Sequence, residues 1–470
     1  MPDSPSSSTG ATPRSRAAGL SGVPALTPVP TPDTAPDLHV RTFPIPDPGD
    51  LVALLPHREA IRTFTWVRRG DGLVGWGEAL RIETSGPERI READTAWARA
   101  LAGMAVDDDV DVPGTGPVAF GSFAFSPASP SGGVLVVPEV VVGRRDGRAW
   151  MTIVSASENT PDNDAATPPT LPEPEPVTAP GSVTYTDGAL DAEDWVRAVA
   201  AVIDRIATGE VSKVVMARDV LARTEHQVDV RHLLRRLTAG YEWCWTFSVD
   251  GLVGSTPELL VRREKGLAAS RVLAGTIRRT GDDAADLRHA AELARSSKDL
   301  EEHEIAVASL VRALQPYCAS INVPEAPFVL HLPNVMHLAT DITGVVDGAF
   351  GHPSTFPSHS PGGLGPSSLA LAAALHPTAA VGGTPTPAAT AILAEAETMD
   401  RGRYAGPVGW IGADGDGEWG IGLRSGEVSP RDESSVRLFA GCGIVAASDP
   451  RAELAEADAK LEPMREALGG

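Results

Sequence analysis

Cysteine, long apolar runs and a secretion signal are scarce or absent in this 470-residue chain. The three cysteines, Cys244, Cys318 and Cys442, are too few and too widely spaced for a disulfide scaffold or a CxxC metal knuckle. No apolar run approaches the length of a membrane-spanning helix, and the N-terminus has no hydrophobic core of a signal peptide. These absences predict a protein of the reducing cytoplasm without a membrane partner.

Positive charge is also in short supply. The chain has 40 lysines and arginines against 62 aspartates and glutamates, a formal net charge of -22, and a pI of about 4.9. Nucleic acids and anionic membrane surfaces repel such a protein, so we expect neither as its main partner. Hydrophobic residues still make up 42% of the chain, which is enough for a substantial core and excludes global disorder.

Composition divides the chain into four segments. Residues 1–36 are rich in proline, serine and threonine and predict a disordered tail, while residues 37–157 alternate short apolar runs with turn signals and predict a mostly-β half. Residues 158–183 form a proline-rich, acidic linker, and residues 184–470 mix helices and strands. Because no regular βαβ rhythm is present, an α+β fold is favoured over a dinucleotide-binding sheet.

Lys213 is the first residue that suggests chemistry. It lies in the apolar run Val211–Ala217, where strand alternation places it on the same face as Val215. A lysine buried among apolar neighbours is desolvated, which favours its neutral form and suits it to act as a base. An edge-strand lysine that reaches out to water is the plainer alternative.

Two predicted helices each carry a pair of carboxylates three residues apart, which places both members on one helix face. The pairs are Asp299 with Glu302, and Glu453 with Glu456, and Lys460 follows four residues after Glu456. Converging pairs could hold a hard cation such as Mg2+. Solvated, ion-paired helix surface is the commoner explanation in an acidic protein.

Glycine-rich segments follow two apolar runs. They are Gly275–Thr276 and Gly441–Cys442–Gly443, and we interpret both as tight turns that could present backbone N–H groups to an anion. Neither matches a P-loop or a dinucleotide fingerprint.

The order of the short motifs along the chain is more informative than any one of them. Together they resemble the chorismate-utilising enzymes, which comprise isochorismate synthases, salicylate synthases, anthranilate synthase large subunits and aminodeoxychorismate synthases. The resemblance covers about residues 191–468, and AFGSFAFSP at residues 119–127 is similar to the N-terminal half of the family. The motifs are SKVVMAR (212–218), GSTPEL (254–259), LAGT (273–276), KDLEEH (298–303), HLAT (337–340), HPTAAVGG (376–383), RGRYAGPVG (401–409), AGCGIV (440–445) and the segment from Ser448 to Lys460.

This resemblance implies an anthranilate synthase component I-like α+β fold, with two stacked antiparallel β-sheets, helices outside and an active-site cleft between them. It also implies Mg2+ as cofactor and chorismate as substrate. By motif position, Lys213 is the base that activates water and Glu258 is the acid that protonates the departing C4 hydroxyl. The implied metal residues are Glu302 and Glu456, with Asp299 and Glu453 holding metal-bound waters. The residues implied to position the substrate carboxylates are Thr276, His337, Tyr404, Arg424, Gly441, Gly443 and Lys460.

Two positions separate members of the family. Anthranilate synthases have a glutamine at the position of Lys213, and aminodeoxychorismate synthases have a nucleophilic lysine at the position of Ala274. We therefore expect an isochorismate synthase, with salicylate synthase, which goes on to eliminate pyruvate, as the alternative. HPTAAVGG is similar to the isochorismate synthase motif. No glutamine amidotransferase subunit is expected, so a monomer is predicted, and either menaquinone or siderophore biosynthesis fits.

The chain also departs from the family pattern. Ala379 replaces a proline, Asp299 a glutamate and Leu454 a common aromatic residue, and the loop at residues 351–368 is longer than usual. These departures leave a weakly active, regulatory homologue as a further hypothesis.

Overall fold

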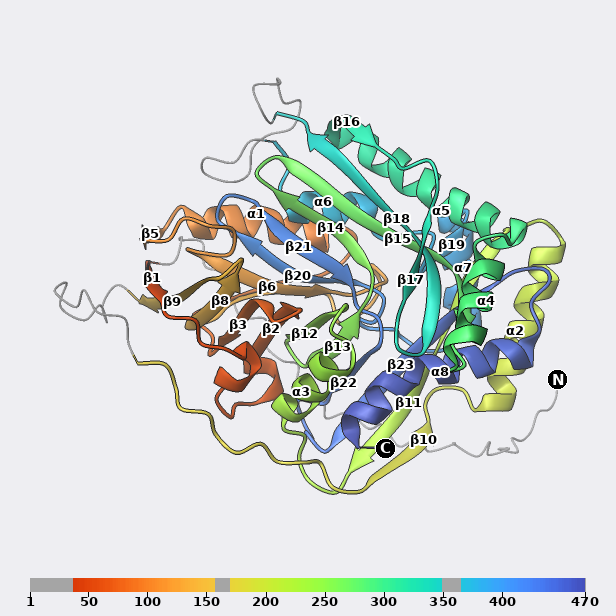
Figure 1. Cartoon of the computed structure of the whole chain (residues 1–470), viewed down its shortest axis with the longest axis horizontal. Helices are drawn as coiled ribbons and strands as arrows, with labels where there is room; N and C mark the ends of the chain where they lie inside the picture. Colours follow the sequence, from red (N-terminus) through yellow and green to blue (C-terminus); the bar gives the residue numbers. More distant parts are fainter. Residues whose placement is uncertain (1–36, 157–169, 349–364, 470) are drawn as a thin grey trace, which may run out of the picture. The chain divides into compact units, whose positions relative to one another are not determined.

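Antiparallel β-sheet forms most of the framework in the computed structural model (Figure 1), which describes residues 37–156, 170–348 and 365–469. The predicted tail at residues 1–36, residues 157–169 of the linker and most of the loop at 351–368 lie outside these ranges. Residues 170–182 of the linker contain no helix or strand. From residue 37 on, the described residues belong to one compact unit, so the predicted boundary between the two halves stays a prediction.

The first sheet combines strands from both halves of the chain. Its order is β10-β11-β23-β22-β13-β12-β2-β3-β8-β9-β1-β5, with β19 paired to β11, and all its pairs are antiparallel except β1 with β5. Its strands are β1 (Leu38–Ile45), β2 (Thr63–Arg68), β3 (Asp71–Trp76), β5 (Met104–Asp108), β8 (Val140–Arg145), β9 (Arg148–Ala156), β10 (Val183–Asp187), β11 (Lys213–Thr224), β12 (Trp245–Val249), β13 (Leu252–Thr256), β19 (Gly383–Thr384), β22 (Ser425–Val428) and β23 (Ser435–Ile444).

The second sheet is antiparallel throughout. Its order is β16-β18-β15-β14-β21-β20-β6-β7-β4, with β17 paired to β18. Its strands are β4 (Leu80–Thr84), β6 (Val118–Phe123), β7 (Gly133–Val137), β14 (Leu259–Glu264), β15 (Leu267–Arg278), β16 (Cys318–Asn322), β17 (Phe328–His331), β18 (Val335–Val346), β20 (Pro407–Gly412) and β21 (Gly417–Ile421).

Aromatic side chains fill the space between the sheets. Phe64 of β2 and Phe120 of β6 are completely buried, and their ring centroids lie 5.6 Å apart. Glu418 of β21 accepts hydrogen bonds across the sheets from the indole nitrogens of Trp66, at 2.7 Å, and Trp245, at 3.1 Å. Because each buried indole N–H has an acceptor, these tryptophans contribute apolar area without an unsatisfied donor. The predicted α+β fold of two antiparallel-rich sheets is confirmed.

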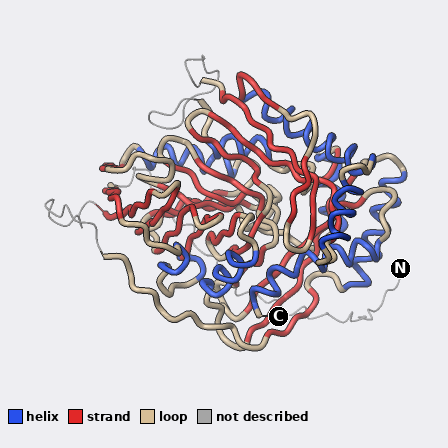
Figure 2. Tube along the Cα trace, viewed as in Figure 1, coloured by secondary structure: helices blue, strands red, loops and turns tan. Residues whose placement is uncertain are grey.

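Helices flank the sheets, as the blue segments in Figure 2 show. One face of α2 is apolar: Trp195, Val199, Val202 and Ile206 are buried, and Ile203 is half-buried. No helix in the described part of the chain is long and apolar enough to cross a bilayer. The helices are α1 (Arg89–Leu101), α2 (Ala192–Ala207), α3 (Val230–Gly240), α4 (Asp283–Leu293), α5 (Ser297–Leu314), α6 (Ser368–Leu375), α7 (Thr386–Ala396) and α8 (Pro450–Leu468).

Helix α8 carries three of the predicted site residues. Side-chain hydrogen bonds cap its first turn and compensate for a proline inside it. The Asp449 carboxylate accepts hydrogen bonds from the backbone N–H groups of Arg451, at 3.1 Å, and Ala452, at 2.8 Å. Pro463 lies inside the helix and has no N–H to donate to the carbonyl of Ala459. Asn334 donates to that carbonyl instead, at 3.3 Å, so the helix continues past the proline.

We predict that Asp449→Ala lowers the free energy of unfolding by about 1 kcal/mol, because the first turn of α8 loses its cap. Asp449→Asn keeps an acceptor oxygen at the same position and serves as the control. Denaturant midpoints of the two variants and the parent chain measure the effect. Equal midpoints for the alanine and asparagine variants would contradict the capping role.

Candidate active site

All thirteen predicted site residues line a single cavity of about 210 Å³. Strands β11 and β23 of the first sheet, strands β15 and β18 of the second, and helices α5 and α8 contribute to its wall. The residues brought together are Lys213, Glu258, Thr276, Asp299, Glu302, His337, Tyr404, Arg424, Gly441, Gly443, Glu453, Glu456 and Lys460. The fold therefore brings together residues that lie far apart in the sequence.

Lys213 is the first residue of β11, and it lines the cavity together with Val215, as strand alternation predicts. Its side chain is 13% exposed, so Lys213 is half-buried. Its ammonium group also lies 2.5 Å from Oε1 of Glu302, which sequence reasoning did not foresee. The two side chains form an ion pair at the cavity wall.

The interpretation of Gly441 and Gly443 as a tight turn is wrong, because both lie inside β23. They face Ala217 and Val215 across the pairing of β23 with β11. A Cβ atom at Gly443 would lie 2.8 Å from Cε of Lys213, and one at Gly441 would lie 2.9 Å from the carbonyl oxygen of Met216. The missing side chains therefore leave room for Lys213 and for close approach of the backbones.

Glu258 lies where the chain passes from β13 in the first sheet to β14 in the second. Its side chain is 6% exposed. Burial raises the pKa of its carboxyl to about 8, although the charges of Lys213 and Lys460 act in the opposite direction. Glu258 is therefore mostly protonated at neutral pH and is able to donate a proton.

Thr276 and His337 are partners on the neighbouring strands β15 and β18, and Thr276 Oγ1 lies 3.0 Å from His337 Nδ1. The pairing register shifts at Gly275, whose φ of +77° is left-handed, so this glycine forms a bulge in a strand rather than the turn that we expected. Burial, with the charges of Arg424 and Lys460, lowers the pKa of His337 to about 3. Its ring is therefore neutral.

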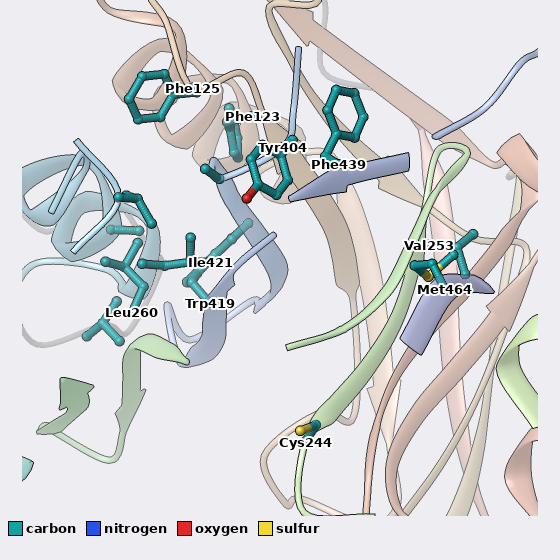
Figure 3. Close-up of a cluster of buried hydrophobic side chains, with 14 of the residues drawn as sticks. Phe123, Phe125, Cys244, Val253, Leu260, Tyr404, Trp419, Ile421, Phe439 and Met464 are labelled. Atoms are coloured by element: carbon teal, nitrogen blue, oxygen red, sulfur yellow. The ribbon is translucent and has the colours of Figure 1, made fainter. Parts of the chain in front are cut away.

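Tyr404 and Arg424 are both buried at the cavity wall. The Tyr404 ring stacks on Phe439 of β23, with centroids 5.1 Å apart and planes inclined by 9° (Figure 3). Burial raises the pKa of the Tyr404 phenol well above its usual range, so it stays a hydrogen-bond donor. Arg424 has a left-handed φ of +49°, and its buried guanidinium supplies positive charge to the cavity.

The second lysine of the cavity repeats the arrangement of the first. Lys460 Nζ lies 2.7 Å from Oε1 of Glu456 and donates to the carbonyl of Gly441 at 2.9 Å. Burial acts to raise the pKa of Glu456, but the charge and hydrogen bond of Lys460 outweigh it, and the net shift is downward. Burial raises the pKa of Glu453, the other carboxyl on this helix face.

The four predicted metal residues therefore share one cavity, but two of them contact lysines. Among the described residues, no three histidine, cysteine, aspartate or glutamate side chains are arranged to hold a metal ion. Glu302 with Lys213 and Glu456 with Lys460 are both present as ion pairs. The ion pair of Glu456 with Lys460 is the one that the plainer interpretation of this helix predicted, although it lines a cavity.

Sequence reasoning assigned no role to Arg401, which also lines the cavity. It is 3% exposed, and its guanidinium donates to both carboxylate oxygens of Glu397. It also donates to the carbonyls of Val381, at 3.0 Å, and Val215, at 2.5 Å. No helix spacing reveals the pair, because α7 ends at Ala396 and Arg401 lies in the loop that follows.

Comparisons with known proteins identify the family of the chain. A family model described as chorismate binding enzyme matches residues 39–469. The isochorismate synthase MenF of Bacillus subtilis is 30% identical to this chain over 421 residues, which cover 85% of each chain. The isochorismate synthase DhbC of the same organism is 38% identical over 288 residues, which cover 59% of this chain and 68% of DhbC. The solved structure of MenF, the menaquinone-specific isochorismate synthase from Escherichia coli, superimposes with a TM-score of 0.74 at 25% identity, covering 93% of this chain and 95% of that one. The chain belongs to the chorismate-binding enzyme family.

Proposed function

We propose that the protein is an isochorismate synthase, which converts chorismate to isochorismate in a Mg2+-dependent reaction. The observation that carries the proposal is the presence of Lys213 and a buried, mostly protonated Glu258 in one cavity. The names of the relatives support the same activity. Ala274 also lines the cavity and offers no nucleophile, which supports addition of water rather than attack by a side chain.

The reaction exchanges one hydroxyl for another, so it needs a base and an acid at two positions of the ring. Lys213 has to leave Glu302 and lose its own proton before it can accept a proton from the water that attacks C2. Glu258 donates its proton to the C4 hydroxyl, which leaves as water while the ring double bonds shift. Because one group gains a proton and the other loses one, proton exchange with solvent resets the site after each turnover.

Chorismate is a dianion, so its carboxylates need positive partners. The cavity provides Lys213, Arg424 and Lys460, in addition to Arg401, which is paired with Glu397. The first three cations face the four carboxyl groups of Asp299, Glu302, Glu453 and Glu456. The protein alone therefore offers no excess of positive charge. The remaining groups, among them the Thr276 hydroxyl and the Tyr404 phenol, supply neutral hydrogen bonds that orient the substrate.

A divalent cation fits this set of groups, because Mg2+ prefers carboxylate oxygens and retains water ligands. We propose that Glu302 and Glu456 hold it directly and that Asp299 and Glu453 hold its waters. When bound, it would neutralise charge on the substrate and join a substrate carboxylate to the acidic side of the cavity. The expected monomeric state and cytoplasmic location stay predictions, as does the choice between menaquinone and siderophore pathways.

Incubation of the purified protein with chorismate and Mg2+, followed by NMR of the products, tests the proposed activity. Isochorismate as the main product is expected. Salicylate with pyruvate would replace the assignment by salicylate synthase, and anthranilate formed with ammonium would contradict the proposed role of Lys213. The absence of any turnover would favour the hypothesis of a regulatory homologue.

Lys213→Ala is expected to reduce kcat by about 10²–10⁴-fold, the usual contribution of a positioned base. Lys265→Ala is the matched control, because Lys265 is exposed and lies outside the cavity. Steady-state rates of isochorismate formation measure both effects. A Lys213→Ala enzyme as fast as the control would exclude Lys213 as the base.

The pH dependence of kcat/KM tests Glu258 as the acid. Its pKa is raised to about 8, so the carboxyl loses its proton as the pH rises through 8, and kcat/KM should fall about tenfold per pH unit above that value. Glu258→Gln should reduce kcat by about 10²–10⁴-fold while chorismate still binds, because glutamine keeps the size of the side chain. Retained activity in Glu258→Gln would assign proton donation to another group.

Glu302→Gln and Glu456→Gln are each expected to raise the Mg2+ concentration required for half-maximal activity by at least about tenfold. Glu301→Gln is the matched control, since Glu301 is an exposed neighbour on the same helix and does not line the cavity. Removal of metal with EDTA should abolish turnover in all of these proteins, and added Mg2+ should restore it. An unchanged Mg2+ requirement in both cavity variants would refute the assigned metal site.

A further inference from the structure

A second cavity, of about 630 Å³, lies beside the active site and shares Arg401 with it. Its size falls within the range of small-molecule sites, about 300–1,000 Å³. The wall is built by α1, the loop after β6, the end of α6 and helix α7. The apolar side chains that line it include Ile90, Phe125, Ala373, Leu393 and Met399.

Arg89 lines this cavity and is 4% exposed. Its guanidinium donates to the carbonyls of Ala124, at 3.1 and 2.5 Å, Phe125, at 3.1 Å, and Gly86, at 3.3 Å. Across the described ranges, no carboxylate lies within ion-pair distance of it. A buried cation with only neutral acceptors is costly, and an anion that reached it would be stabilised.

The other charged groups of the second cavity already have partners. Arg91 pairs with Glu88 at 3.1 Å, and Arg401 pairs with Glu397. Asp400 is exposed and accepts hydrogen bonds from the Ser129 hydroxyl, at 2.8 Å, and the Gly402 N–H, at 3.0 Å. Burial lowers the pKa of His376 to about 4, so that ring is neutral. Arg89 is therefore the charge that a ligand would meet.

We propose that the second cavity binds a small apolar monocarboxylate. Its carboxylate pairs with the Arg89 guanidinium, and its ring or hydrocarbon body lies against Phe125, Leu393 and Met399. A dianion of the chorismate type fits less well, since the described residues of the wall offer one cation without an ion-pair partner among them and a mostly apolar surface.

The wall between the two cavities links such a ligand to the active site. The Arg401 guanidinium lies 4.3 Å from the centroid of the Phe125 ring and donates to the carbonyl of Val215. Glu397 accepts from the N–H of Ala217 at 2.7 Å. Because Val215 and Ala217 follow Lys213 in β11, an occupant that moves this ion pair alters the cavity in which chorismate is proposed to bind. We infer that the ligand changes the affinity for chorismate, an inference that rests on the proposed function.

Calorimetric titration of 1-naphthoate into the full chain tests the site, with neutral 1-naphthamide as the isostere. We expect naphthoate to bind at least about tenfold more tightly than the amide, because only the carboxylate pairs with Arg89. Ala394→Trp places a large side chain in the cavity from an exposed position on α7 and should abolish binding. Ala391→Trp, also exposed on α7 but outside the cavity wall, should bind as the parent does. Equal binding by the two tryptophan variants would overturn the proposed location.

Arg89→Met tests the counter-ion and should weaken naphthoate binding by at least about tenfold while binding of the amide is unchanged. Arg91→Met is its control, because Arg91 lines the same cavity but is exposed and already paired. A loss of binding in Arg91→Met alone would overturn the role of Arg89. The amide titration reports whether the cavity of each variant is intact.

The effect on the active site is measured as the KM for chorismate with and without saturating naphthoate. A change of about 5–150-fold is the usual range of such coupling, and it should vanish in Ala394→Trp. Binding without a change in KM would overturn the inferred coupling and leave the site itself supported. A protein that binds naphthoate but does not turn over chorismate would overturn the proposed function alone, since binding is measured without catalysis.

Discussion

The antiparallel pairing of β11 with β23 is the interaction on which the active site depends. Its register places Val215 opposite Gly443 and Ala217 opposite Gly441, so the face that carries Lys213 meets a strand without side chains at those points. Other contacts fix the same stretch of β11, including the indole of Trp195, which donates to the carbonyl of Ala217 at 3.1 Å. A register shift of two residues would move Lys213 away from Glu302 and bring side chains into the space that its methylenes occupy.

The charged groups of the cavity lie in a chain whose net charge is strongly negative. The chain has a formal net charge of -22, and its proposed substrate is a dianion, so bulk electrostatics oppose binding. Lys213 and Lys460 offset that charge locally, but each is held by a carboxylate of the proposed metal site. The carboxyl of Glu258 adds no negative charge to the cavity, because burial keeps it protonated. One cavity therefore combines paired charges with a neutral carboxylic acid, to which the proposed function assigns binding and proton transfer.

Residue spacing along the sequence predicted some features of the active site and was misleading about others. The spacing of three residues placed Asp299 with Glu302, and Glu453 with Glu456, on single helix faces, and the spacing of four residues predicted the Glu456–Lys460 ion pair. The same local reasoning was wrong about Gly275, Gly441 and Gly443. The residues around a glycine in the sequence do not tell whether it lies in a turn or within a strand that packs closely against its neighbour. Arg401 was overlooked because its partners, Glu397, Val381 and Val215, come from separate elements.

The sequence by itself determined the α+β class, the helix faces of the carboxylate pairs and, through the order of its motifs, the family. These features follow from local periodicity or from short runs of residues, which need no knowledge of distant contacts. Tertiary structure alone decided that Lys213 contacts Glu302, that Glu258 is buried enough to stay protonated, and that a second cavity lined by the buried Arg89 shares Arg401 with the first. Each of these depends on groups far apart in the chain, because desolvation and charge pairing are set by neighbours in space.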